Sequence, residues 1–375
     1  MEPGILLFGL FFVLLLAGVP ILTAVGASAL LFLWQFDLGI QVTAANVYAN
    51  IAKFPLLAIP FFILAGFVMD RVGLSRGLVT LLNLLVEPEA AATTDVLIPP
   101  SVAFVVYAVI TETSVARLFA AGVVPGLLMG LALVVPVVWL SRRHGWGGEP
   151  WGTPREIARA AWEAKWGLVA PVIILGGIYG GVFTPTEAAV VAVAYGLFVG
   201  LVVFRNLGLR ELYATFRDAA VASAVVMIVV AFAGLFSWTG STLGVMDRAA
   251  RGLLGWSDNP YVILLLLNAL LLVAGMLLDA ISIYYVFLPI FLPLMKQFAW
   301  DPIWFGVMMT VNLAIGTVTP PVAVNLYVAA RLAKVPIEEV SRWALPFVAA
   351  LLVALLLVVY VPALTLWLPD ALGIR

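Results

Sequence analysis

The sequence has little of the chemistry that most enzymes and metal sites use. Cysteine is absent, and the single histidine, His144, lies in a basic stretch. Without cysteine there are no disulfides or thiolate metal sites, and one histidine leaves almost no room for imidazole catalysis. An enzyme within a membrane would be left with Asp70 and Asp279, which both end apolar segments. We therefore expect neither an enzyme nor a bound cofactor.

Charge is also scarce. Asp, Glu, Lys and Arg make up 10% of the chain, hydrophobic residues make up 64%, and the mean hydropathy is +1.16. Because a water-soluble domain carries about 25% charged residues, this composition excludes one. Many apolar runs have about 20 residues, which is the length that crosses a bilayer as a helix. We predict an all-α protein with many spans in the lipid bilayer. Nothing in the charge pattern indicates nucleic-acid binding.

One stretch departs from the pattern of apolar helices. Asn312-Leu-Ala-Ile-Gly-Thr-Val-Thr-Pro-Pro321 precedes Asn325, and its two prolines remove two backbone donors, so a helix should break there. Such a break survives in hydrocarbon only inside protein or beside a watery cavity, where carbonyl, Thr and Asn oxygens suit a dehydrated cation. The alternative is a proline kink in an ordinary packing helix. The Ser/Thr/Gly cluster from Ser237 to Gly244 is also expected to unwind.

Features of the first part of the chain recur in the last part. The pair Pro99-Pro100 recurs 221 residues later as Pro320-Pro321, and Pro125 recurs at the same spacing as Pro346. Gly66 and Asp70 recur 209 residues later as Gly275 and Asp279. Paired broken helices in two halves are the best sequence sign of a secondary transporter's binding site. We therefore predict two related halves, each with a broken helix.

We interpret residues 1–375 as a single membrane transporter domain. Residues 1–140 form the first repeat, residues 141–218 hold a basic loop and a connecting helix pair, and residues 219–375 form the second repeat. A re-entrant hairpin is expected at about 280–321. The basic loop, with Arg142 and Arg143 at its start, is predicted to be cytoplasmic by the positive-inside rule.

Four ordered motifs together resemble the large membrane subunit of TRAP transporters, the tripartite ATP-independent periplasmic transporters. They extend along most of the chain: Phe54-Pro-Leu-Leu-Ala-Ile-Pro-Phe-Phe-Ile-Leu-Ala-Gly66, Gly176-Gly-Ile-Tyr-Gly-Gly-Val-Phe-Thr-Pro-Thr-Glu-Ala-Ala189, Asn312-Leu-Ala-Ile-Gly-x-x-Thr-Pro-Pro321 and Tyr360-Val-Pro-Ala-Leu-x-Leu-Trp-Leu-Pro369. Each motif alone is weak, whereas the combination is specific. The resemblance predicts the permease fold, with two pseudo-symmetric halves and two re-entrant hairpins.

The resemblance also implies a function and a location. It predicts a sodium-driven symporter of organic acids, such as C4-dicarboxylates or sialic acid, in the bacterial inner membrane. Transport would proceed by an elevator motion, and sodium would be the coupling ion. The implied partners are a small membrane subunit and a soluble periplasmic protein that delivers the substrate.

Eight residues are candidates for the site. Gly316 and Thr319 match the family's Gly-x-x-Thr-Pro-Pro, and we expect their oxygens to bind sodium, with further ligands from Asp279 and Ser101. Candidates for the substrate are Asn312, Asn325, Thr317 and Thr94. Alternatives remain open, because Asp279 is equally suited to cap a helix, and Asn312 and Asn325 to brace the loop. Glu187, in Thr184-Pro-Thr-Glu187, is interpreted as a helix-start cap.

The first half departs from the family pattern. Between Asp70 and Pro99 there are 28 residues, whereas 40 separate Asp279 from Pro320. The first re-entrant region is therefore shortened, at 78–96, where the family carries a Gly/Ser-rich hairpin. Either the sequence omits residues, which we favour, or the protein is a shortened, non-transporting relative or scaffold subunit.

Overall fold

The fold is described from a computed structural model that covers residues 3–74, 101–145, 153–320 and 323–374. In these ranges the regular elements are helices. Seven of the described helices are long and apolar enough to cross a membrane. The predicted all-α, multi-span architecture is therefore confirmed. The shortened region at 78–96 lies outside the described residues.

The described residues 3–74 form four α-helices and a short 3-10 helix. They are α1 (Pro3–Leu16), α2 (Ile21–Gln35), α3 (Val42–Ile51), η1 (Phe54–Leu57) and α4 (Ala58–Val72). Pro20 precedes α2, and a proline there loses no helical hydrogen bond. Gly73 ends α4 in the left-handed conformation, with φ of 88°, which glycine adopts at little cost.

The middle part contains the longest helices. It comprises α6 (Val102–Thr111), α7 (Val115–His144), α8 (Pro154–Tyr179), α9 (Pro185–Phe198), the π-helical turn η3 (Val199–Val203) and α10 (Leu209–Thr242). The predicted cap at Glu187 is confirmed, because the Thr184 amide donates to Glu187 Oε2 (2.8 Å) and the Glu187 amide donates to Thr184 Oγ1 (3.3 Å). This reciprocal pair is a capping box and starts α9.

The expectation that Ser237 to Gly244 unwinds was wrong, since α10 continues to Thr242. Thr239 Oγ1 donates to the Leu235 carbonyl at 2.9 Å, so this hydroxyl is satisfied within the helix. A cluster of helix-disfavouring residues was thus overridden by packing, because Thr239 and Gly240 are buried.

The C-terminal part is a series of shorter helices around one long span. These helices are α11 (Val245–Leu254), α12 (Pro260–Leu277), α13 (Ala280–Gln297), α14 (Pro302–Gly316), α15 (Val324–Ala333), α16 (Ile337–Tyr360) and α17 (Ala363–Ala371). Asn259, Asp279 and Asp301 cap α12, α13 and α14 through their side-chain oxygens.

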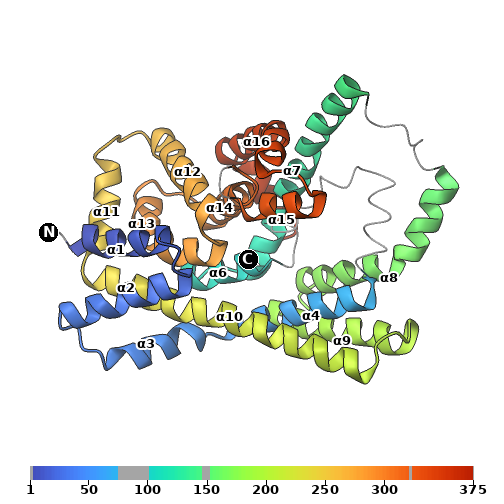
Figure 1. The fold of residues 1–375 in the computed structure, drawn as a ribbon, viewed down its shortest axis with the longest axis horizontal. Coiled ribbons are helices and arrows are strands. Elements are labelled where there is room, and N and C mark those ends of the chain that lie inside the picture. The colour runs from blue at the N-terminus through green and yellow to red at the C-terminus, as the bar shows by residue number, and fades with distance from the viewer. Residues whose placement is uncertain (1–2, 75–100, 146–152, 321–322, 375) are drawn as a thin grey trace.

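The helices form two groups (Figure 1). Along one edge lie α2, α3, α4, α9 and α10, with α10 packed on α2, α3 and α4, and α4 packed on α9. The other group contains α6, α7 and α12 to α17, in which α14 packs on α12, α7 and α16. The two groups meet chiefly where α13 packs on α10. The candidate site lies in the second group.

Within the second group, α6–α7 and α15–α16 have the same local plan. In both, a helix of 10 residues ends at a left-handed residue, Glu112 (φ 55°) or Lys334 (φ 57°), before a long helix begins. Helices α7 and α16 pack in opposite directions. His144, which ends α7, contacts Trp343 near the start of α16 (ring centroids 5.2 Å apart), whereas Arg117 near the start of α7 reaches α17, which follows α16.

Candidate functional site

The site is organised around the break between α14 and α15. As predicted, the helix that carries Asn312 does not continue through the Pro-Pro pair, because α14 ends at Gly316. The hydroxyl of Thr319 donates to the Ile315 carbonyl (2.6 Å), and that of Thr317 donates to the Ala314 carbonyl (2.7 Å). The Thr319 amide donates to the Gly316 carbonyl at 3.1 Å. These bonds pair carbonyls that the end of a helix leaves without partners.

Thr317 and Asn325 are brought together across the break. Asn325 Nδ2 donates to Thr317 Oγ1 at 3.2 Å, and the Asn325 amide donates to the Thr317 carbonyl at 3.4 Å. Asn325 is exposed, whereas Thr319 is buried at 8% exposure. Two of the predicted substrate residues thus lie side by side and brace the loop between α14 and α15.

The end of α14 lies directly on the backbone of α12. A β-carbon placed on Gly316 would lie 2.7 Å from Gly275 Cα, and one placed on Gly275 would lie 3.2 Å from Gly316 Cα. No side chain fits between the two backbones. Glycine at both positions therefore allows the backbones of α12 and α14 to pack this closely next to the break.

A buried amide pair strengthens the same crossing. Asn312 Nδ2 donates to both the carbonyl oxygen and the side-chain oxygen of Asn268, each at 2.9 Å. Asn268 Nδ2 donates to the Leu264 carbonyl at 2.8 Å. Asn312 is fully buried, and its own Oδ1 has no partner among the described residues, which makes it a costly group to hold there. Asn312 therefore faces α12.

Asn268 was missed by the sequence analysis. It lies in the apolar run of α12, and a lone Asn inside such a run was the available signal, since polar groups in a membrane helix usually face a partner. The run was interpreted only as a span, so the residue that bonds Asn312 went unnoticed.

Asp279 lies at the turn between α12 and α13. Its Oδ1 accepts hydrogen bonds from the amides of Ile281 and Ser282, each at 3.0 Å, and its Oδ2 accepts one from the Ser282 hydroxyl at 2.6 Å. This is the capping geometry that the sequence analysis considered as an alternative. Because Gly275 touches Gly316, the turn follows the helix crossing closely and lies near the break.

The first-half candidates have a different status. Ser101 is buried and caps α6, where its Oγ accepts a hydrogen bond from the Phe104 amide at 3.5 Å. Thr94 lies outside the described residues. The structure therefore brings Thr317 and Asn325 together at the break, whereas the contacts that it describes for Ser101 and Asp279 are local.

An aromatic and hydroxyl cluster joins α6, α13 and α14. Tyr107 of α6 donates to the Pro302 carbonyl at the start of α14 (2.7 Å), and its ring lies 5.7 Å from that of Tyr284 of α13. The Tyr284 and Thr310 hydroxyls are 2.7 Å apart, and Thr310 donates to the Gly306 carbonyl at 2.7 Å. No spacing in the sequence marked these residues, because their partners are distant in the chain.

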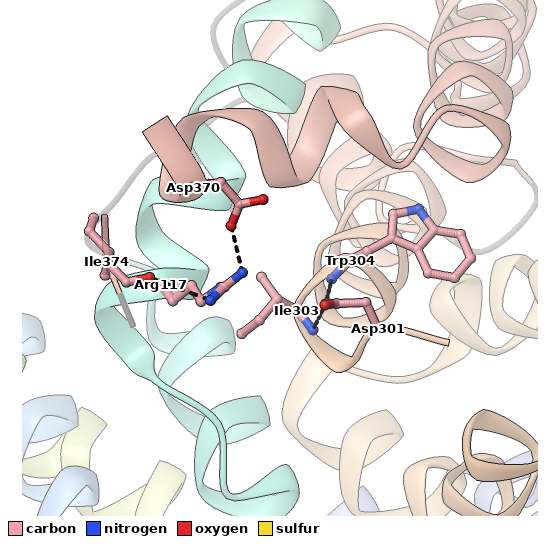
Figure 2. Close-up of polar contacts among 6 residues, drawn as sticks. All are labelled: Arg117, Asp301, Ile303, Trp304, Asp370 and Ile374. Atoms are coloured by element: carbon pink, nitrogen blue, oxygen red, sulfur yellow. Dashed lines mark hydrogen bonds and ion pairs between the residues drawn. The ribbon is translucent and has the colours of Figure 1, made fainter. Parts of the chain in front are cut away.

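The start of α14 is also held by side-chain hydrogen bonds. Figure 2 shows the Asp301 carboxylate accepting from the amides of Ile303 (2.7 Å) and Trp304 (3.1 Å). The Trp304 ring nitrogen donates to the Val358 carbonyl of α16 at 2.9 Å. Figure 2 also shows Arg117 bonded to Asp370 of α17 at 2.7 Å. The bond from Trp304 to Val358 connects α14, which ends at the break, to α16.

The donor set of the site is oxygen-rich. It offers backbone carbonyls, two Thr hydroxyls and one cap carboxylate, which are groups that hard cations prefer. The described residues contain no cluster of three or more His, Cys, Asp or Glu side chains that could bind a metal ion. The oxygen groups at the break can therefore bind a cation, as hard cations take oxygen ligands.

The chain matches the family model described as "Tripartite ATP-independent periplasmic transporter, DctM component" over residues 8–87 and 88–364. The chain belongs to this family. It is a multi-pass membrane protein of a transporter permease family and not an enzyme. The resemblance inferred from the four motifs is confirmed.

The chain is similar to relatives whose names give different substrates. The isethionate TRAP transporter permease protein of Oleidesulfovibrio alaskensis is 38% identical, over 98% of this chain and 66% of that protein. The C4-dicarboxylate large permease protein of Pseudomonas aeruginosa is 36% identical, over 89% of this chain and 90% of that one. The sialic acid large permease protein of Vibrio cholerae is 32% identical, over 95% of this chain and 96% of that one.

A solved structure shares the fold. The YdaH transporter of Alcanivorax borkumensis matches with a TM-score of 0.57, covering 96% of this chain and 98% of that chain at 14% identity. This likeness concerns the fold alone.

The alignments also measure a difference in length. The aligned length is 420 with the isethionate permease and 441 with the C4-dicarboxylate permease of Vibrio cholerae, whereas the whole chain has 375 residues. These relatives therefore carry at least 45 and 66 positions without a counterpart here. The family match divides between residues 87 and 88, inside the interval that the sequence analysis identified as short.

Proposed function

We propose that this chain is the large membrane subunit of a sodium-driven symporter that imports an organic acid. The observation that carries the proposal is the break at Gly316 and Thr319, packed against α12, in a chain of the DctM family. The substrate class is a small organic anion such as a C4-dicarboxylate, sialic acid or isethionate, because relatives carry those names.

In this proposal sodium is held by oxygens at the break. The Gly316 carbonyl and the Thr319 oxygens are the expected ligands, with Asp279 and Ser101 as further candidates. The Thr319 hydroxyl now donates to the Ile315 carbonyl, so its lone pairs are free to face a cation. Several such oxygens are needed, since a cation loses its hydration shell on entry. Asn312, Asn325, Thr317 and Thr94 remain the candidates for the substrate.

The movement proposed is that of an elevator. The group with α6, α7 and α12 to α17 would carry the site past the group with α2, α3, α4, α9 and α10. Two observations support this division: the groups meet chiefly along α13 and α10, and α7 and α16 pack in opposite directions, as corresponding helices of inverted halves do. The predicted repeats, residues 1–140 and 219–375, and the hairpin at about 280–321 belong to the same proposal.

The proposed partners are a small membrane subunit and a periplasmic binding protein, in the bacterial inner membrane. Membership in a tripartite periplasmic transporter family supports both.

The test is uptake into proteoliposomes. The chain is reconstituted with a small subunit and a binding protein from the same organism, and uptake of labelled succinate, sialic acid and isethionate is followed with an inward sodium gradient. We expect uptake of one of these acids, and its loss when potassium replaces sodium. Equal uptake with potassium would refute sodium coupling.

A second candidate is a shortened, non-transporting relative or scaffold subunit. It is favoured by the aligned positions that have no counterpart in this chain. Intact mass of the purified natural protein separates the two. A mass several kilodaltons above 40.1 kDa means that the sequence omits residues, whereas a matching mass together with absent uptake favours the second candidate.

A further inference from the structure

A cavity of about 710 Å³ lies where the end of α7 meets the start of α16, away from the break. Its lining includes Trp139, Arg143, Glu338, Glu339, Arg342 and Trp343. Two arginines and two glutamates thus surround one space, and two tryptophans flank them. Tryptophan is enriched where a membrane helix leaves the hydrocarbon, and the basic end of α7 is predicted to be cytoplasmic.

The opposite charges in this cavity are not paired with one another. Among the described residues, none of Arg143, Arg342, Glu338 and Glu339 forms an ion pair with another side chain. The guanidinium of Arg143 instead lies over the Trp139 ring, 5.3 Å from its centroid. Helix-end charges are ordinary, since glutamate suits the start of α16 and arginine the end of α7. A preference of charges for helix ends does not explain why these two arginines and two glutamates line one cavity without forming ion pairs.

The cavity adjoins a second one, a groove whose lining is apolar apart from Ser141 and Glu339. A second cavity of about 320 Å³ shares Leu140, Glu339 and Trp343 with the first. Its other walls include Ala333 of α15 and Phe347 of α16. A charged space that adjoins an apolar groove has the shape of a site for an amphiphile, with a polar head and a hydrocarbon chain.

We propose that these two cavities bind one phospholipid with a zwitterionic amine headgroup, as in phosphatidylethanolamine. Arg143 and Arg342 bind the phosphate, because guanidinium matches phosphate oxygens with several donors. Glu338 and Glu339 accept the ammonium, and one acyl chain lies in the apolar groove. Basic pockets between membrane helices on the cytoplasmic side commonly bind lipid headgroups, and the two glutamates add the requirement for an amine. The lipid would tie α7 to α16.

The proposal is tested by native mass spectrometry of the full chain in detergent. The protein is mixed with equal amounts of phosphatidylethanolamine and phosphatidylglycerol, and the lipid adducts are counted. We expect about tenfold more phosphatidylethanolamine, which corresponds to one charge-assisted contact. Glu338→Gln with Glu339→Gln should remove this preference, and Arg143→Gln with Arg342→Gln should reduce both adducts. Phosphoethanolamine, which has the headgroup without acyl chains, should not compete at equal concentration.

Matched controls are Arg142→Gln, one residue away on α7 and outside the cavity, and Glu211→Gln, in the first turn of α10. Both should keep the preference. Equal binding of the two lipids by the unchanged protein, or a preference that survives both pairs of substitutions, would overturn the proposal. So would full competition by phosphoethanolamine or by inorganic phosphate, since the site would then bind a free anion. Circular dichroism checks that each variant is folded.

Discussion

The break after α14 and the start of α6 both lie at a Pro-Pro pair, in positions that the sequence predicts to correspond, yet they are supported differently. At the break, the Thr317 and Thr319 hydroxyls donate hydrogen bonds to the last carbonyls of α14, and Gly316 packs on Gly275 of α12. At the start of α6, Ser101 makes one long capping bond of 3.5 Å. The match to the family model also divides in the interval before Ser101, between residues 87 and 88. Among the described residues, the break after α14 therefore has more hydrogen bonds and closer backbone packing than the start of α6 has.

The largest effect is expected from restoring the short interval. The residues that the isethionate permease carries between its counterparts of Glu87 and Pro88 would be inserted there, because the family match divides at this point. Because a two-hairpin site needs both halves, sodium-driven uptake should rise about tenfold or more, which corresponds to at least 1.4 kcal/mol. An insert of Gly and Ser of the same length is the control. Uptake that is unchanged by the native segment would contradict the comparison.

Gly316→Ala should be the most harmful single substitution. Its β-carbon would lie 2.7 Å from the Gly275 backbone, so α12 and α14 must separate, at a cost of about 1–3 kcal/mol. We expect a lower midpoint of thermal unfolding and loss of uptake. Gly66→Ala is the matched control, because the sequence predicts that Gly66 corresponds to Gly275 and a β-carbon there meets open space. A similar loss in both variants would show that the crossing is not special.

The Asn268–Asn312 pair can be separated from direct substrate contact. Either Asn→Ala variant leaves buried polar atoms unpaired, so we expect about 1–3 kcal/mol of lost stability for each and a clear coupling energy in the double-mutant cycle. Thermal unfolding of the two single variants and the double variant measures it. If Asn312 also binds substrate, Asn312→Ala will raise KM and Asn268→Ala will not. Additive losses of stability would argue against the bridge.

The two halves can next be compared through their hydroxyl groups. Thr319→Val removes an oxygen at the break while keeping the shape of the side chain, and should raise the sodium concentration for half-maximal uptake about tenfold. Ser101→Ala removes the weaker cap and should raise it less. Thr319→Ser retains the oxygen and serves as the control. An equal rise in the Ser variant would show that packing, and not the hydroxyl, is responsible.

Sequence reasoning was accurate where the signal is local. The Pro-Pro pair fixed the position of the break, and Thr184 with Glu187 gave the capping box, because proline and short capping motifs act within a few residues. It was less complete where partners are distant in the chain. Asn268 and the contact of Gly275 with Gly316 depend on how α12 crosses α14, and no local pattern encodes that crossing.

The same limit applies to the candidate residues. Asn312 was identified from its place before the break, but its direction toward α12 follows from packing. Asp279 was correctly placed at a helix end, and the structure shows the cap. Their predicted roles toward sodium and substrate stay predictions, which the uptake measurements above address.

The smallest effect is expected at the ion pair between Arg117 and Asp370, which joins α7 to α17 (Figure 2). Their side chains are 27% and 59% exposed, so water and salt screen the pair, and Asp370→Asn should cost about 1 kcal/mol at most. The loss in thermal midpoint should shrink as salt is raised, because exposed charges are screened over about 10 Å at 0.1 M. Arg217 and Asp218, an exposed pair of neighbours on α10, provide the control through Asp218→Asn. A loss at Asp370 that equals the loss at Gly316, and that salt does not reduce, would mean that α17 supports the site as strongly as α12 does.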